Sequence, residues 1–373
     1  MNSLDKYLEY VHKELSNQTT HKVIVSGNDS ADLDSIISSL IFAYLSYTQQ
    51  KDTNTLFIPL VKVPKADLEL RPELNFVLKQ VGLDYKKLIT IDEIDTSQPT
   101  HIVLIDHNQL TVPFHTEAWE NHVVAILDHH VDEKLYLNAP IRVVDMVGSC
   151  VTLVLKHFEI SVSAPWLTED IALLSMAPLL VDTVNLKWDL GRTTESDVQV
   201  FNVLKEKVQN MEFNAFFKSI EKVKSEVDTM ANYDILRRDY KEFPNVNGYK
   251  IGTSAVTWNF RAWAERENGT ESISKTAIDY ARERGLDMEV IFTAFDYDRE
   301  EVRGGDYRRE LAVFVINKDL ERVKISLENN KDLQLTPIEF GDSSAYYDQG
   351  NIKMSRKQVW PLLKKLIETH DDL

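Results

Sequence analysis

Residues 21–35 read HKVIVSGNDSADLDS, an apolar run that ends in an acidic loop led by glycine. His21 to Ser26 have the composition of a buried strand, and a helix is predicted to follow from about Leu33 to Tyr47. A strand, a short loop and a helix in this order form the unit from which α/β domains with parallel sheets are built.

Similar apolar runs recur through the first half of the chain. We predict further strands at residues 56–61, 102–105 and 123–127, because compact runs of this kind are typical of parallel strands buried on both faces. Pro59 lies inside the first of these runs and indicates a sheet edge or a bend, since proline donates no hydrogen bond to a neighbouring strand. The predicted fold class is therefore α/β, with a mostly parallel sheet in this half.

The second half of the chain has a different pattern. Residues 193–230 are charged, periodic and free of Pro and Gly, which predicts helices that link two domains. Beyond them we predict strands at 249–256, 288–295 and 310–316, helices at 258–284 and about 356–369, and a polar loop at 296–309. The predicted domains are an N-terminal domain over residues 1–225 and a smaller C-terminal α+β domain with a mixed sheet over residues 226–373.

The composition argues against several classes of protein. The chain has 373 residues and a formal net charge of −17, which disfavours nonspecific nucleic-acid binding. No run of about 18 apolar residues predicts a membrane span, and the first residues lack the layout of a secretory signal. The single cysteine, Cys150, predicts a reducing compartment, so we expect a cytosolic protein. The sequence identifies no protein partner, and a monomer is the simplest expectation.

Polar side chains follow the predicted strands at several places. The loop 27–35 follows the first strand. The strands predicted at 102–105 and 123–127 end in Asp106-His107-Asn108 and Asp128-His129-His130. A further apolar run, Leu179-Leu180-Val181, is also read as a strand and leads into Asp182. In open α/β sheets, ligands bind beyond the carboxyl ends of the strands, so these groups are predicted to meet at one rim. Taken singly, Asp32 or Asp34 could cap a helix or serve a turn, and His129 could be a hydrogen-bonded core residue.

Taken together, these polar groups favour a metal site. Clustered carboxylates repel one another unless a cation neutralises them. Oxygen and imidazole ligands without a thiolate suit Mn²⁺ or Mg²⁺, and less specifically Co²⁺ or Zn²⁺. The sequence therefore predicts a site for a pair of divalent ions at this rim.

The triplet Asp128-His129-His130 resembles the signature of the DHH phosphoesterases, and the other three motifs lie in the order of that family's metal motifs. In the C-terminal half, residues 238–243 (RDYKEF) and 355–359 (SRKQV) are similar to the opening and the closing phosphate motif of one branch. That branch holds family II inorganic pyrophosphatases, prune-type proteins and fungal exopolyphosphatases. The resemblance covers nearly the whole chain.

The resemblance implies a role for each matching residue. The implied catalytic residues are Asn28, Asp106, His129 and His130. The implied metal ligands for Mn²⁺ or Mg²⁺ are Asp32, Asp34, Asp106, His129 and Asp182, with Asp106 and Asp182 shared between two ions. The implied substrate-binding residues are Asn28, His107, His130, Lys241, Arg309, Arg356 and Lys357. Arg and Lys suit phosphate because Arg presents a planar fork and Lys a movable point charge.

One departure from the pyrophosphatase pattern bears on the substrate. Pyrophosphatases of this branch have Gly-His, with a metal-binding His, where this sequence has Gly27-Asn28; the fungal exopolyphosphatases resemble it here. We therefore expect metal-dependent hydrolysis of terminal phosphates from inorganic polyphosphate, with release of orthophosphate.

Other functions stay open at this point. Asp106-His107-Asn108 resembles the pyrophosphatase version of its motif, so a family II-type inorganic pyrophosphatase is an alternative, and a prune-like regulatory protein with weak phosphatase activity is another. RecJ-type phosphodiesterases carry Gly-Gly-Gly-His, which Arg303-Gly304-Gly305-Asp306 does not match. Nothing near Cys150 marks a reactive thiol, and we expect a small buried residue there.

Overall fold

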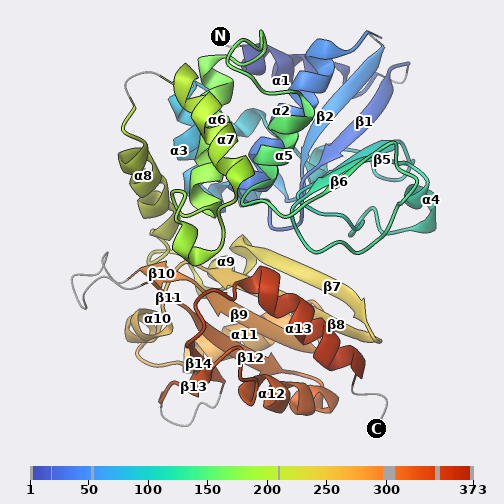
Figure 1. Cartoon of the computed structure of the whole chain (residues 1–373). Coiled ribbons are helices and arrows are strands. Elements are labelled where there is room, and N and C mark those ends of the chain that lie inside the picture. The colour runs from blue at the N-terminus through green and yellow to red at the C-terminus, as the bar shows by residue number, and fades with distance from the viewer. Residues whose placement is uncertain are drawn as a thin grey trace. The chain divides into compact units, whose positions relative to one another are not determined.

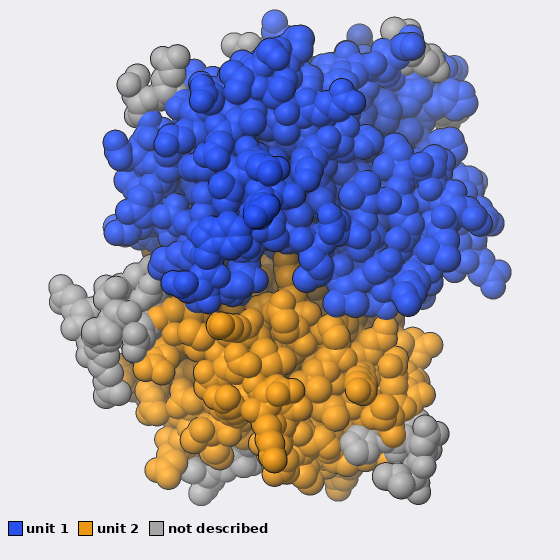
Figure 2. Space-filling view, viewed as in Figure 1, with its two compact units in different colours: residues 1–224 blue, residues 225–373 orange. Residues whose placement is uncertain are grey.

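The computed structural model describes residues 3–17, 19–51, 54–208, 211–296, 307–340 and 345–369. The chain divides into two compact units, Met1–Lys224 (unit 1) and Ser225–Leu373 (unit 2), which Figure 2 colours separately. The boundary lies at the end of helix α8 (Phe213–Ser225), one residue before the boundary expected from the sequence. Most of the loop predicted at 296–309, including residues 303–306, lies outside the described residues.

Unit 1 is built on a six-stranded, all-parallel sheet with the order β3-β2-β1-β4-β5-β6 (Figure 1). The chain adds β2 and β3 on one side of β1 and then returns to place β4 on its other side. The direction of strand addition therefore reverses between β1 and β4, and such a switch point is where open α/β sheets bind ligands. The strands are β1 (His21–Ser26), β2 (Thr55–Val61), β3 (Ile89–Thr90), β4 (His101–Ile105), β5 (Val123–Asp128) and β6 (Ile141–Val144).

Both faces of this sheet are buried, which explains why its strands are continuous apolar runs. Val23 and Val25 of β1 face the larger core, whereas Ile24 faces a smaller one covered by Phe114 and Trp119. Helices contribute most of the larger core, and helix α4 (Glu117–Glu120) lies on the smaller one. The helices of the larger core are α1 (Ser3–Glu14), α2 (Leu33–Gln49), α3 (Pro72–Gln80), α5 (Cys150–His157), α6 (Glu169–Asp182), α7 (Glu195–Lys207) and α8.

Two details of unit 1 differ from the sequence-based predictions. Strand β2 is not at the sheet edge, because it lies between β3 and β1. On the β3 side, however, only Leu60 and Val61 are paired, so among the described residues no strand of the sheet pairs with Pro59 on that side. The apolar run Leu179 to Val181 is not a strand leading into Asp182, because it forms the last turn of α6. All residues from 171 to 181 are buried, and a helix buried all round has the same uniform apolar pattern as a buried strand.

Unit 2 contains a mixed six-stranded sheet, as predicted. Its order is β13-β14-β12-β9-β8-β7, in which β8 and β9 are parallel and the other neighbours antiparallel. Helices α9 to α11 pack on one face, and α12 and α13 on the other. The strands are β7 (Tyr240–Val246), β8 (Tyr249–Val256), β9 (Met288–Thr293), β12 (Glu310–Val315), β13 (Leu335–Pro337) and β14 (Tyr346–Gln349), with β10 (Phe295–Asp296) and β11 (Tyr307–Arg308) as a separate pair. The helices are α9 (Asn232–Arg238), α10 (Phe260–Glu267), α11 (Glu271–Glu283), α12 (Glu321–Glu328) and α13 (Arg356–Glu368).

The single helix predicted at residues 258–284 is wrong, because the chain forms α10 and α11 with a break between them. Asn268 ends α10 in the left-handed conformation, with φ 58°, and Gly269 follows with φ 131°. Asn and Gly are the residues that accept such angles at lowest cost, and they end helices for this reason.

The described helices are short relative to the thickness of a bilayer. The longest of them, α2, has 17 residues, whereas a span needs about 20 apolar ones. In the part of the chain that the structure describes, no helix combines the length and apolarity that crossing a membrane requires.

Candidate metal centre

The loop after β1 is packed tightly against the start of α2. A Cβ atom on Gly27 would lie 2.4 Å from Ser35 Oγ, so this close approach requires glycine. The backbone N–H of Asn28 donates to the same Ser35 Oγ at 2.6 Å. The loop therefore holds Asp32 and Asp34 at the first turn of α2.

These two aspartates have different partners. Asp32 is the N-cap of α2, and its Oδ1 accepts from the N–H of Ser35 at 2.9 Å, so the simpler capping role is present. Asp34 is 2% exposed and points at the N-terminus of α5. Its Oδ2 accepts from the N–H of Cys150 at 2.6 Å, and its Oδ1 accepts from the N–H of Val151 at 3.0 Å. Two backbone donors at a helix N-terminus fix the orientation of this carboxylate.

Asp34 is nevertheless an unfavourable place for a negative charge in the metal-free protein. Burial raises the pKa of Asp34, and the nearby charge of Asp106 raises it further. His129 acts in the opposite direction and is insufficient to offset both. Buried carboxylates that repel in this way are a donor set that a cation would stabilise.

Asp106 lies directly after β4 and faces this cluster. It is 2% exposed and left-handed, with φ 63°, which is uncommon outside glycine. Asn28 Nδ2 donates to Asp106 Oδ2 at 2.6 Å, while Asn28 Oδ1 accepts from the N–H groups of Ser30 and Ala31 at 3.0 and 3.2 Å. The reverse orientation of the amide would set donors against donors, so this network defines which atom is the nitrogen.

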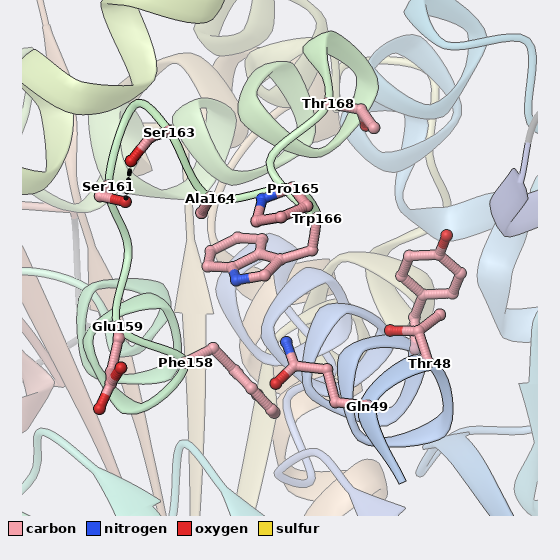
Figure 3. A pocket seen from close by; sticks show the side chains of 11 residues that line it. Thr48, Gln49, Phe158, Glu159, Ser161, Ser163, Ala164, Pro165, Trp166 and Thr168 are labelled. Carbon is pink, nitrogen blue, oxygen red and sulfur yellow. Dashed lines mark hydrogen bonds between the residues drawn. The ribbon is translucent and has the colours of Figure 1, made fainter.

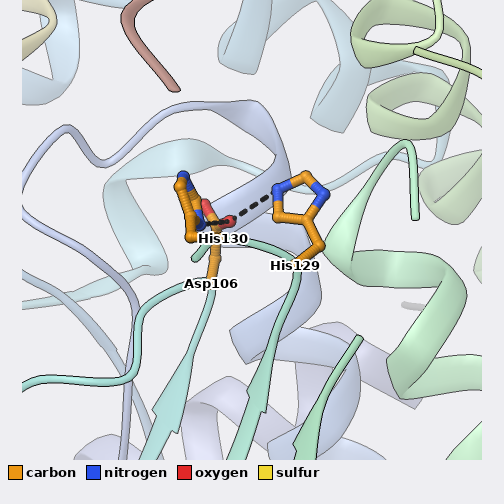
Figure 4. A group of neighbouring side chains, drawn as sticks. All are labelled: Asp106, His129 and His130. Atoms are coloured by element: carbon orange, nitrogen blue, oxygen red, sulfur yellow. Dashed lines mark ion pairs between the residues drawn. The ribbon is translucent and has the colours of Figure 1, made fainter. Parts of the chain in front are cut away.

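Asp128, His129 and His130, at the end of β5, have three different sets of contacts. His129 Nδ1 donates to the carbonyl of Val147 at 3.0 Å, which leaves Nε2 directed at Asp106 Oδ1, 3.0 Å away (Figure 4). His130 Nδ1 lies 2.7 Å from Asp128 Oδ1, and its side chain is 22% exposed. Burial alone would raise the pKa of Asp128, but His130, His129 and the amide of Asn108 together hold it well below its usual range. Asp128 therefore orients His130.

Two sets of possible ligand atoms result. In each set the ligand atoms lie within 4.8 Å of one another: one consists of Asp106, His129 and His130, and the other of Asp34, His129 and Asp182. The sets share His129 and bring together four of the five predicted metal ligands. Asp32 belongs to neither set, and its placement as a ligand stays a prediction.

Asp182 ends α6 and is followed by an unusual turn. Val184, Asn185 and Leu186 are all left-handed, with φ of 50°, 57° and 58°. A β-branched residue such as valine rarely adopts this conformation. The side chain of Thr183 supports the turn, because its Oγ1 donates to the carbonyl of Leu179 and accepts from the N–H of Leu186.

A buried cation at the same rim was missed from the sequence. Lys62 directly follows β2, its side chain is 2% exposed, and its Nζ lies 2.5 Å from Asp29 Oδ1. Burial opposes ionisation of Asp29, but Lys62 lowers the pKa of that carboxyl overall. The available signal was a charged residue placed directly after a predicted strand.

Lys62 also affects His107, a predicted substrate-binding residue. Burial and the charge of Lys62 lower the pKa of His107 to about 4, so its ring is neutral at pH 7. Its Nδ1 donates to the carbonyl of Ile105 at 2.9 Å, so Nε2 carries a lone pair. In the metal-free protein, the ring is therefore neutral and is oriented by the backbone of β4.

In unit 2 the predicted basic residues come from three segments. Arg356 begins α13, and its guanidinium lies 2.6 Å from Asp239 Oδ1. Asp239 is two residues before Lys241, which lies on β7. Lys357 is exposed. Arg309 is only 5% exposed, and its Nε donates to the carbonyl of Ile352, which precedes α13. The segments that carry Lys241 and Arg356 are thus in contact, and the Arg309 side chain is buried against the segment that precedes α13.

Cys150 is a buried small residue, as expected. It is fully buried, and its Sγ donates to the carbonyl of Leu127 at 3.1 Å. Burial, with Asp34 nearby, raises the pKa of its thiol well above the usual value. A nucleophilic thiolate is therefore disfavoured here.

A pocket of about 710 Å³ lies elsewhere in unit 1. Its wall includes Thr48 and Gln49 at the end of α2, facing Trp166 and Pro165 of the loop before α6 (Figure 3). Asp34 is in the first turn of the same helix, and a helix of this length spans roughly 25 Å. The pocket is therefore separate from the candidate metal centre.

The fold and this constellation can be compared with known proteins. Residues 22–178 match the DHH family, N-terminal domain, and residues 218–366 match the DHHA2 domain. A Schizosaccharomyces pombe protein, provisionally named an exopolyphosphatase, is 30% identical over 366 residues, or 91% of this chain and 89% of that protein. Exopolyphosphatase PRUNE1 of Mus musculus is 28% identical over 361 residues, or 94% and 76% of the two chains.

Pyrophosphatases are also similar to this chain. A manganese-dependent inorganic pyrophosphatase of Methanocaldococcus jannaschii is 26% identical over 288 residues, or 74% of this chain and 83% of that protein. The crystal structure of a provisionally assigned family II inorganic pyrophosphatase from Methanococcus jannaschii has the same fold, with a TM-score of 0.67 and 23% identity over 93% of this chain and 99% of that one. The chain therefore belongs to the DHH phosphoesterase superfamily, in the branch of exopolyphosphatases and family II inorganic pyrophosphatases that joins a DHH domain to a DHHA2 domain.

Proposed function

We propose that this protein is an exopolyphosphatase, which hydrolyses the terminal phosphoanhydride bond of inorganic polyphosphate and releases orthophosphate. The observation that carries the proposal is the clustering of Asp34, Asp106, His129 and Asp182, from four separate segments, beyond the parallel sheet. Relatives named exopolyphosphatases match over more than nine tenths of this chain, which supports the same chemistry.

The residues of the centre fit divalent ions such as Mn²⁺ or Mg²⁺. The donors are carboxylates and one imidazole, which is the ligand chemistry that these ions prefer. His129 donates its Nδ1 proton to a backbone carbonyl, the usual partner of a metal-binding histidine, and so presents Nε2. We propose that Asp32, Asp34, Asp106, His129 and Asp182 hold two ions. When bound, such ions lower the pKa of a water ligand and neutralise charge on phosphoryl oxygens.

The remaining residues of unit 1 orient these groups and the substrate. Asn28 fixes Asp106 through the 2.6 Å hydrogen bond and is proposed to act in catalysis by this route. Asp128 holds Nδ1 of His130, which leaves Nε2 as the atom proposed to contact the terminal phosphate. His107 is retained as a proposed substrate-binding residue, and the hydrogen bond from its Nδ1 to the carbonyl of Ile105 at 2.9 Å orients its ring.

In unit 2 we propose that Lys241, Arg356 and Lys357 bind phosphate groups. Asp239 holds the Arg356 guanidinium with a contact of 2.6 Å, which leaves its remaining N–H groups in a defined orientation. Arg309 donates to the backbone ahead of α13, so its proposed contribution is to position Arg356 and Lys357.

Inorganic pyrophosphatase is the second candidate, favoured by the motif Asp106-His107-Asn108. Against it stands Asn28, whose amide oxygen already accepts two backbone N–H groups. A metal-binding histidine at this position would lose those bonds. Polyphosphate offers additional phosphates whose binding can assist orientation, so its cleavage depends less on a further metal ligand.

The test is phosphate release from polyphosphate, pyrophosphate and a short RNA, each with Mn²⁺, with Mg²⁺ and with EDTA. The proposal expects the highest kcat/KM for polyphosphate, with no activity in EDTA. A higher kcat/KM for pyrophosphate would establish the second candidate, and no metal-dependent release from either would support a regulatory protein. We also propose a cytosolic location, on the ground of the single cysteine.

A further inference from the structure

An arginine outside the candidate metal centre holds the loop that carries its first ligands. Arg71 is 3% exposed and lies between the 3-10 helix η1 (Lys65–Leu70) and α3. Its Nε donates to the carbonyl of Ala31 at 2.5 Å, and its Nη2 donates to the carbonyl of Ser30 at 2.5 Å. These are the two carbonyls that immediately precede Asp32.

The arginine is itself firmly placed. Its Nη1 donates to the carbonyl of Asp67 at 2.9 Å, and its own carbonyl accepts from the N–H of Leu74 at 3.0 Å at the start of α3. The next residue is Pro72, which disfavours a helical backbone at Arg71, and Arg71 has φ −119° and ψ 67°. Helix α3 is anchored in the core through Leu74 and Leu78. The guanidinium is therefore attached to a rigid part of unit 1.

The loop that Arg71 contacts has a backbone conformation that needs support. Ala31 is left-handed, with φ 45°, and non-glycine residues adopt this conformation only where their surroundings determine it. The planar guanidinium binds two consecutive carbonyls at once, which a single ammonium group does not do with the same geometry. Arg71 thus fixes the direction of both carbonyls around the strained residue.

The peptide between Ser30 and Ala31, whose carbonyl accepts from Arg71, also leads to the centre. The N–H groups of Ser30 and Ala31 donate to Asn28 Oδ1, and Asn28 Nδ2 donates to Asp106 Oδ2. A continuous series of hydrogen bonds therefore joins Arg71, through the loop and Asn28, to Asp106. The same loop carries Asp32 and Asp34 into the first turn of α2.

We propose that Arg71 is a positioning residue for divalent metal binding, acting through the 28–32 loop on Asp32, Asn28 and Asp106. The inference rests on the proposed function in one respect, namely that the centre binds divalent ions. A purely stabilising arginine would raise the melting temperature of unit 1 and leave metal affinity unchanged. A positioning arginine changes metal affinity at temperatures where the protein is fully folded.

The experiment compares full-length wild type, Arg71→Lys and Arg71→Met. Mn²⁺ affinity is measured by isothermal titration calorimetry at 25 °C, and folding by calorimetric melting of the metal-free proteins. The expected dissociation constant rises in the order wild type, Lys, Met, by roughly 10–100-fold for Met, which is typical when a group that orients metal ligands is removed. Lys is expected to recover part of the affinity because it can donate to one carbonyl.

Arg266→Met is the matched control. Arg266 also donates to two backbone carbonyls, those of Asp228 at 3.0 Å and Met230 at 2.7 Å, but it belongs to unit 2. This variant is expected to melt at a lower temperature and to bind Mn²⁺ within about twofold of wild type.

The outcomes separate this inference from the proposed function. Folded Arg71 variants with Mn²⁺ affinity within twofold of wild type would overturn the inference, and if Arg71→Met does not fold, Arg71→Lys decides by the same criterion. A wild type that binds Mn²⁺ without hydrolysing polyphosphate refutes the exopolyphosphatase proposal and still decides the role of Arg71. A wild type that binds no Mn²⁺ contradicts both.

Discussion

Replacing Asp106 with Asn removes one charge from the candidate metal centre and preserves the shape of the side chain. Asp106 Oδ1 lies 3.0 Å from His129 Nε2, and its Oδ2 accepts from Asn28 at 2.6 Å. We expect kcat on polyphosphate to fall by roughly 10²–10³-fold, the usual loss when one preorganised electrostatic group is removed. Mn²⁺ affinity is expected to fall as well, because a neutral amide does not neutralise a cation.

The stability of the metal-free variant should change in the opposite direction. His129 Nε2 lies 3.7 Å from Asp34 Oδ2 and 3.0 Å from Asp106 Oδ1, so these two oxygens are at most about 7 Å apart. At that distance two unit charges repel by at least about 2 kcal/mol at an effective dielectric constant of about 20. The hydrogen bond from Asn28 loses its charged acceptor, which costs about 1 kcal/mol. The contact between His129 Nε2 and Asp106 Oδ1 also weakens when His129 is protonated, so the gain belongs to the neutral form of His129. In that form, the metal-free variant should be more stable than wild type by about 1 kcal/mol.

The assay combines turnover at saturating Mn²⁺ with urea unfolding in EDTA at pH 8. Asp5→Asn is the control, since Asp5 on α1 is also buried and the substitution removes its 2.7 Å ion pair with Lys87. The control should unfold at lower urea concentration and keep its turnover. Retention of most activity by Asp106→Asn would remove Asp106 from the mechanism. A large loss of stability with unchanged Mn²⁺ affinity would make Asp106 a structural residue.

Three further predictions concern the phosphate-binding residues, the choice of substrate and pH. Arg356→Ala should lower kcat/KM on polyphosphate by roughly 10–100-fold, since each lost charged contact is worth about 1.5–3 kcal/mol. Its Mn²⁺ affinity should be unchanged. Arg282→Ala is the exposed control, and equal kinetics of the two variants would contradict the prediction. Asn28→His should raise the ratio of kcat/KM for pyrophosphate to that for polyphosphate at saturating metal, and an unchanged or lower ratio would show that Asn28 is not the discriminator. Burial raises the pKa of Glu289 to about 8, so the native carboxyl keeps its proton and the stability of unit 2 declines as pH rises from about 4.5 to about 8. Glu289→Gln should remove this decline and be more stable than wild type at pH 9 by about 3–5 kcal/mol, with little difference at pH 4; equal differences in unfolding free energy at the two pH values would refute it.

Local patterns were sufficient to predict the architecture of both units. The runs at 23–25, 102–105 and 123–127 are uniformly apolar because both faces of the sheet are covered there, and that pattern predicted a parallel sheet. Patterning of the second half likewise predicted a mixed sheet. Errors arose where a pattern is ambiguous, as at residues 179–181, whose complete burial makes a helix resemble a strand, and at Asn268, where one left-handed residue divides a helix.

Asp106 and His129 could be found from the sequence because they stand at the ends of strands, and parallel strands place such ends at one rim. Asp182 ends helix α6 and was found through the family resemblance. Their partners could not be found in this way. Arg71 contacts the 28–32 loop although it lies 40 positions further along the chain. Lys62 follows β2 and forms an ion pair with Asp29, which follows the neighbouring strand β1. Asn28 was recognised from its motif, yet only the structure assigns its amide oxygen to two backbone N–H groups and its nitrogen to Asp106. Burial and periodicity determine which residues enter a core or end at a rim. Strand order, loop conformation and hydrogen-bond direction determine which of them touch, and these arise only when distant segments pack together.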